Sequence, residues 1–100
     1  MRIIAKRTLR EFWEDHPRGP EAKSALQVWH SATEAADWAT PADLKKSQGD
    51  ASILKNSRVV FNIAGNRFRL VARINYPYRV VYVRFVGTHE EYDDIDAETI

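Results

Sequence analysis

The chain has 100 residues, of which 44% are hydrophobic and 29% are charged, and it contains no cysteine. This size and composition predict one globular domain that spans residues 1–100. The lack of cysteine excludes disulfides, thiolate nucleophiles and cysteine-based zinc sites, and no run of about 18 apolar residues could span a membrane. We expect a cytoplasmic protein, because the N-terminal apolar stretch is also too short for a signal peptide.

Charge is distributed unevenly along the chain. Residues 1–50 carry eight basic and eight acidic side chains, whereas residues 51–89 carry seven basic and no acidic ones. Residues 90–100 carry six acidic and no basic side chains. Such asymmetry is typical of a protein that binds a polyanion, or of a basic surface shielded by an acidic tail.

The first half of the chain predicts helices. After a short Ile-rich strand at residues 1–5, the capping-box spacing of Thr8 and Glu11 predicts the start of a first helix. That helix ends at residues 17–19, and an apolar stripe predicts a second helix over residues 20–36. Thr40, followed by a proline and an acid, predicts one short helical turn.

The second half predicts strands. A loop over residues 47–57 precedes three segments rich in Val, Ile, Phe and Tyr, namely residues 58–64, 67–75 and 79–86. A tight turn at Gly65-Asn66 and a second turn at residues 76–78 make them antiparallel neighbours. A capping box formed by Thr88 and Glu91 then begins a short C-terminal helix. The predicted fold is α+β with the order β-α-α-β-β-β, in which two N-terminal helices pack on a small twisted antiparallel sheet.

Strand alternation places a set of arginines together. If residues 67–75 alternate between the two faces of the sheet, the core face receives Phe68, Leu70, Ala72 and Ile74. The opposite face then carries Arg67, Arg69 and Arg73, and no acid lies near them in the sequence. The arginine fork donates parallel hydrogen bonds to phosphate and keeps its charge, so we favour a phosphate-binding surface. The alternative is a solvated face paired with the acidic tail.

His89 follows the last predicted strand and is the one histidine in the basic block. Imidazole exchanges protons near neutral pH, which arginine does not, so His89 is a candidate acid or base. Tyr92 lies one helical turn later. Each has a structural alternative, which for Tyr92 is core packing. The acids of the tail match no cation loop, so we expect neither a metal nor a cofactor.

Two strings carry a family resemblance: residues 59–70, VVFNIAGNRFRL, and residues 81–93, VYVRFVGTHEEYD. They resemble the HigB family of type II toxin–antitoxin toxins, and the resemblance covers nearly the whole chain. It implies a RelE-like fold and an endoribonuclease that cleaves mRNA, often on the translating ribosome. It also implies a cognate helix-turn-helix antitoxin as partner.

The resemblance also implies roles for individual residues. Arg69 matches an arginine that contacts the scissile phosphate in the RelE-like group. His89 occupies the position after the last strand where that group keeps a basic or histidine side chain, and Tyr92 resembles its C-terminal tyrosine. Contacts to the rest of the RNA fall to the other basic side chains, Lys55, Arg58, Arg67, Arg73 and Arg84. In the expected metal-independent reaction His89 is the general acid, and Tyr92 or Lys55 is the base. Two alternatives remain: a non-catalytic RNA-binding module, or a docking surface for an acidic protein such as an antitoxin segment.

Overall fold

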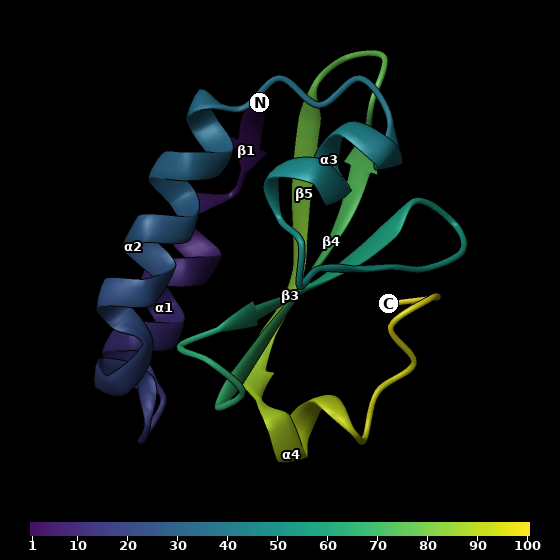
Figure 1. Cartoon of the computed structure of the whole chain (residues 1–100). Coiled ribbons are helices and arrows are strands. Elements are labelled where there is room, and N and C mark those ends of the chain that lie inside the picture. The colour runs from purple at the N-terminus through teal and green to yellow at the C-terminus, as the bar shows by residue number, and fades with distance from the viewer.

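The computed structural model describes all 100 residues and confirms the α+β fold. Helices α1 (Lys6–Asp15) and α2 (Gly19–Ala35) lie side by side and cover one face of a five-stranded sheet (Figure 1). A shorter helix, α3 (Pro41–Ser47), adds Leu44 to the same core. None of these helices has both the length and the apolar character that crossing a membrane requires.

The sheet has the strand order β1-β5-β4-β3-β2. Its strands are β1 (Arg2–Ile4), β2 (Ser52–Ile53), β3 (Arg58–Ile63), β4 (Phe68–Asn75) and β5 (Val80–Thr88). Strands β3, β4 and β5 form the predicted antiparallel meander, and β5 is an interior strand.

The sequence predicted a purely antiparallel sheet, and this prediction was wrong for one pair of strands. Strand β1 runs parallel to β5, with Ile3 opposite Val81, so the sheet is mixed. A parallel partner so distant in sequence is reached through a long connection, and no turn residue in the sequence indicates it. Strand β2 was also not predicted, because it lies in the region expected to be a loop, where it pairs with β3.

Side-chain alternation along β4 places the core as predicted. Phe68, Leu70, Ala72 and Ile74 are each at most 2% exposed and pack beneath α1 and α2. Burial of such side chains stabilises the fold by roughly 1.5–3 kcal/mol each for the larger ones. Strand β4 is therefore fixed in register, and the side chains between these positions must point to the other face of the sheet, which we call the outer face.

Some of the sequence signals that predict helix starts and turns were confirmed, and others were wrong. The Thr40 cap and the Thr88–Glu91 capping box are both present. In contrast, α1 begins at Lys6 without a side-chain cap, and the Glu11 carboxylate pairs with Arg7 at 2.7 Å. The two-residue turn at Gly65-Asn66 is replaced by a loop over residues 64–67, since Ile63 and Phe68 are the last β3–β4 pair.

The outer face is covered in its middle by residues 93–100, which we call the C-terminal segment. It runs back from α4 (His89–Tyr92) on the side of the sheet away from α1 and α2 (Figure 1). Ala97 packs on Val60 and Val71, which are almost fully buried. The rest of this small cluster comprises Leu54, Phe85, Tyr92, Ile95 and Ile100.

Candidate nucleic-acid interface

Arg69 lies on the outer face near one end of β4. Its neighbours across the sheet are Asn62 of β3 and Gly87 of β5. Its Nη1 donates to the main-chain oxygens of Asn66 at 3.0 Å and of Phe68 at 3.2 Å. No carboxylate pairs with it, so its positive charge is not neutralised within the chain and its remaining donors are free for a ligand.

His89 lies at the same end of the outer face as Arg69. It is the first residue of α4 and follows Gly87, the cross-strand neighbour of Arg69, by two positions. Its main-chain N–H donates to the oxygen of Arg67 at 3.1 Å. Its Nδ1 lies 3.4 Å from a carboxylate oxygen of Asp93, and 47% of the side chain is exposed. The ring is thus oriented on one edge and open to solvent on the other.

Tyr92 follows His89 on α4 and is partly buried. Its ring packs against the cluster around Val71, which is the core role. Its hydroxyl makes no hydrogen bond within the chain. Arg69 pairs with Gly87, two residues before His89, and Tyr92 ends the same short helix, while the catalytic roles of the three side chains stay predictions.

Arg67 does not share this face, contrary to the expectation from strand alternation. It lies in the turn before β4, and its Nη1 contacts the Glu21 carboxylate of α2 at 3.3 Å. Its guanidinium lies 6.0 Å from the centre of the Phe68 ring, on the helix side of the sheet. Alternation does not extend into a turn, and the partner acid comes from a distant helix.

Arg58 is also committed to a contact within the chain. Only 9% of the residue is exposed, and its Nη2 donates to the main-chain oxygen of Ile100 at 2.6 Å. Asn56 also bonds the main-chain oxygen of Glu98, at 3.1 Å. Arg58 thus helps to hold the C-terminal segment on the outer face.

The other basic residues remain free. Arg73 lies opposite Arg58 on β4 and is exposed, and its side chain has no hydrogen bond or ion pair. Arg84 is the extra residue of a β-bulge, because Phe85 and Val83 face consecutive residues of β4. The ammonium of Lys55 is likewise without a partner. Val71, buried under the C-terminal segment, separates Arg69 from Arg73, so the predicted basic face is divided.

Sequence patterns missed a charged cluster beside His89, at the turn between α1 and α2. Arg18 contacts Glu21 at 3.2 Å and Glu90 at 3.9 Å, and its guanidinium lies 5.2 Å from the centre of the Phe68 ring. A hydrogen bond from its own main-chain N–H, with added help from the charge of Arg18, lowers the pKa of Glu90. No local signal in the sequence indicates the contacts of Arg18 with Phe68 and Glu90, because these residues are 50 or more positions away in the chain.

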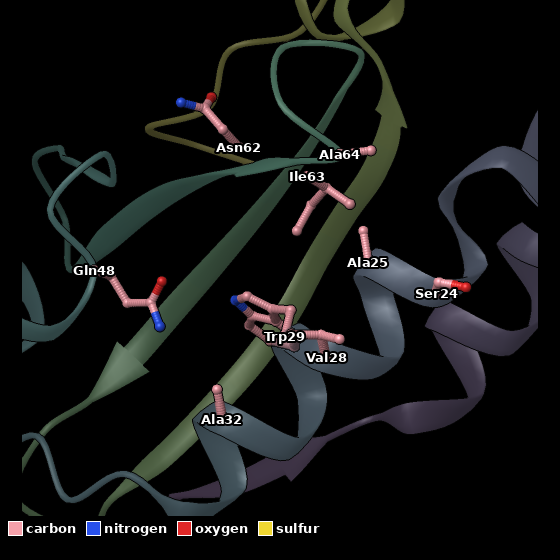
Figure 2. A pocket seen from close by; sticks show the side chains of 9 residues that line it. All are labelled: Ser24, Ala25, Val28, Trp29, Ala32, Gln48, Asn62, Ile63 and Ala64. Carbon is pink, nitrogen blue, oxygen red and sulfur yellow. The ribbon is translucent and has the colours of Figure 1, made fainter.

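No group of His, Asp or Glu side chains is placed to hold a metal ion. A groove of about 330 Å³ lies between α2 and the end of β3, lined largely by apolar side chains such as Val28, Trp29 and Ile63 (Figure 2). None of the predicted site residues lines this groove, so the candidate interface is an open surface at the Arg69 end of the outer face.

Comparison with known proteins identifies the family of the chain. Residues 22–95 match a family described as HigB_toxin, the RelE-like toxic component of a toxin-antitoxin system. The chain is 28% identical over 99 residues to the mRNA interferase toxin HigB of Escherichia coli K12. The aligned region covers 97% of this chain and 92% of the relative. The mRNA interferase HigB of Shigella flexneri gives the same values. The chain therefore belongs to the HigB toxin family, whose members are the RelE-like toxic components of toxin–antitoxin systems.

Proposed function

We propose that this chain is the toxin of a type II toxin–antitoxin system and that it arrests translation by cutting mRNA. The family and the relatives named as mRNA interferases support an endoribonuclease. The observation that carries the proposal is the position of Arg69. Its guanidinium is free of acids, is held by two main-chain oxygens and lies at the same end of the outer face as His89 and Tyr92.

The reaction that fits these groups needs no metal. The 2′-oxygen of a ribose attacks the adjacent phosphorus, the bond from phosphorus to the 5′-oxygen breaks, and the products are a 2′,3′-cyclic phosphate and a 5′-hydroxyl. The 2′-hydroxyl loses one proton and the leaving 5′-oxygen gains one. Arg69 stabilises the negative charge that develops on the non-bridging oxygens.

The two proton transfers fall to residues of α4. When the His89 ring is protonated, its Nδ1–H points to Asp93 and its Nε2–H is open to donate to the leaving oxygen. Tyr92, on the same short helix, is the better placed of the two candidate bases. Lys55 lies in the loop before β3, close to Glu98 of the C-terminal segment, whose carboxylate accepts from the Lys55 main-chain N–H.

An antitoxin partner follows from membership of the family. We further propose that this antitoxin is a helix-turn-helix protein and that the toxin acts in the cytoplasm on mRNA bound to the ribosome. Lys55, Arg73 and Arg84 supply free cations for additional RNA contacts. Arg58 and Arg67 already have partners in the chain, so we do not assign them RNA contacts.

Induced expression followed by mapping of mRNA ends tests this function. We expect the wild type to arrest growth and to create new 5′-hydroxyl ends within messages. Loss of the general acid in His89→Ala should slow cleavage by about 10²–10⁴-fold, and Arg69→Ala should also relieve the arrest. Arg10→Ala is the matched control, since Arg10 is exposed on α1 and has no partner. Full arrest by both folded variants, or RNA binding without any cleavage by the wild type, would overturn the proposal.

A further inference from the structure

A contact between the two ends of the chain holds α4, the short helix that carries His89. Glu91 accepts a hydrogen bond from the Thr88 main-chain N–H at 2.8 Å. Both of its carboxylate oxygens also lie close to Nε2 of His16, at 3.1 and 3.2 Å. An isolated helix of four residues is not stable in water, so contacts of this kind determine where α4 lies.

His16 is itself held in a fixed orientation. Its Nδ1 accepts from the main-chain N–H of Arg18 at 3.0 Å, which places the proton of the neutral ring on Nε2, facing Glu91. The ring stacks on Phe12 with 4.6 Å between centroids, and Phe12 meets Phe68 of β4 edge-on at 5.8 Å. Only 22% of the His16 side chain is exposed. Glu91 is therefore bonded to a donor that is anchored in the helix-side core.

These contacts also favour the ionised form of Glu91. The hydrogen bond from the Thr88 main chain, followed by the contact with His16, lowers the pKa of its carboxyl group. The carboxylate is thus the form that joins β5, α4 and the end of α1. His16 and Glu91 are 75 residues apart in sequence, and the contact was not among the sequence expectations.

We propose that His16 and Glu91 are positioning residues for RNA cleavage, which hold α4 so that His89 stays in place beside Arg69. Neither residue touches a reacting atom in this scheme, and the inference rests on the function proposed above. A misplacement of about 1 Å in a catalytic group can cost about 10²-fold in rate. An exposed ion pair contributes only about 0–1 kcal/mol to folding. Loss of the contact should therefore lower the rate more clearly than the stability.

Conservative variants separate these effects. His16→Phe keeps the stack on Phe12 and removes both the Nε2 donor and the Nδ1 acceptor of the Arg18 N–H, whereas His16→Gln keeps a side-chain N–H that can reach the carboxylate. Glu91→Gln keeps an oxygen that can accept from the Thr88 main-chain N–H. Its amide N–H group replaces the other oxygen and faces the Nε2 donor of His16, so two donors oppose each other. We expect kcat to fall by about 10- to 100-fold in His16→Phe and Glu91→Gln, with KM unchanged, and to recover partly in His16→Gln. The double variant His16→Phe/Glu91→Gln should be no slower than either single one.

A control is the exposed pair between Arg7 and Glu11, which joins two residues of α1 and does not contact α4. Glu11→Gln should leave kcat and thermal stability unchanged. Wild-type kcat in His16→Phe would overturn the positioning role. So would a loss of rate in proportion to the loss of unfolding free energy, with additive effects in the double variant.

Amide hydrogen exchange gives a readout that does not depend on cleavage. In His16→Phe the amides of Thr88 and Glu91 should exchange faster than in the wild type, while those of β4 should not change. Unchanged exchange at α4 would overturn the inference even if the wild type is an active nuclease. A wild type that cuts no RNA would instead refute the proposed function, and the exchange result would still decide whether His16 holds α4.

Discussion

At the scale of single residues, Arg58 and Arg73 show how far two like side chains can differ. They are cross-strand neighbours on the outer face, at the end of β3 and β4 away from Arg69. Arg58 is buried and bonded to the main-chain oxygens of Asn56 and Ile100, whereas Arg73 is exposed and unpaired. Arg58 therefore makes a structural contact, whereas Arg73 is a free cation available to RNA.

Substitution of each by alanine should separate the two roles. Arg58→Ala removes charge-assisted hydrogen bonds, each worth about 1.5–3 kcal/mol, and should lower the free energy of unfolding by about that much. Arg73→Ala should change it by less than about 0.5 kcal/mol and weaken RNA binding instead. Chemical denaturation and RNA titration of both variants measure this. Equal stability of the two variants would contradict the assignment.

At the scale of elements, the close approach of α1 and α2 depends on Gly19. A Cβ atom on this residue would lie 2.1 Å from the main-chain oxygen of Phe12 and 2.7 Å from Cα of Trp13. Both atoms belong to the main chain of α1, so they can give way only if the helices separate. Glycine is required at this position because the main chain of α1 lies too close to leave room for a side chain.

Gly19→Ala should therefore destabilise the protein, by about 1–3 kcal/mol, as expected for overpacking. Gly49→Ala is the control, because a Cβ there meets nothing within 4 Å. Thermal unfolding of the two variants should show a clear drop in Tm for the first and none for the second. A Gly19→Ala protein as stable as the wild type would show that the helices move apart at no cost.

The elements predicted from sequence were those with local signals. The capping box at Thr88 and Glu91, the cap at Thr40 and the alternation along β4 all depend on residues a few positions apart. The parallel pairing of β1 with β5 and the short β2 depend on distant partners, and no turn or period in the sequence indicates them. The fold class was thus predictable, and the complete sheet was not.

The candidate site divides in the same way. The positions of Arg69, His89 and Tyr92 along the chain follow from the register of β4 and β5 and the helix after it, and their roles stay predictions. Arg67 was misplaced because its partner, Glu21, lies on a helix far away in sequence. The covering of Val71 by the C-terminal segment was unforeseen for the same reason.

At the scale of the whole molecule, the net charge of +1 conceals a surface with few free cations in its basic block. Those that carry neither an acid partner nor a C-terminal contact on their side chains are Lys55, Arg69, Arg73 and Arg84. RNA affinity should depend on salt through these contacts, since each phosphate neutralised on a single strand contributes about −0.7 to the slope of log K against log salt.

If each free cation contacts one phosphate, we expect a slope of roughly −3 for a single-stranded RNA. Arg69→Ala should reduce its magnitude by about 0.7, whereas Arg67→Ala should leave it nearly unchanged because Glu21 already neutralises that guanidinium. Fluorescence anisotropy at several salt concentrations measures both. An equal change in the two variants would show that the ion pair with Glu21 opens when RNA binds.

Under the proposed function, the C-terminal segment limits the length of nucleic acid that can lie flat against the sheet. A strand that passes over Arg69 must rise over Ala97 and its neighbours to reach Arg73, because they occupy the surface between the two arginines. The number of nucleotides in register with His89 is therefore limited by residues 93–100 and not by the length of β4. Changes in the length or bulk of this segment would alter how many bases are read, while the groups that cut stay the same.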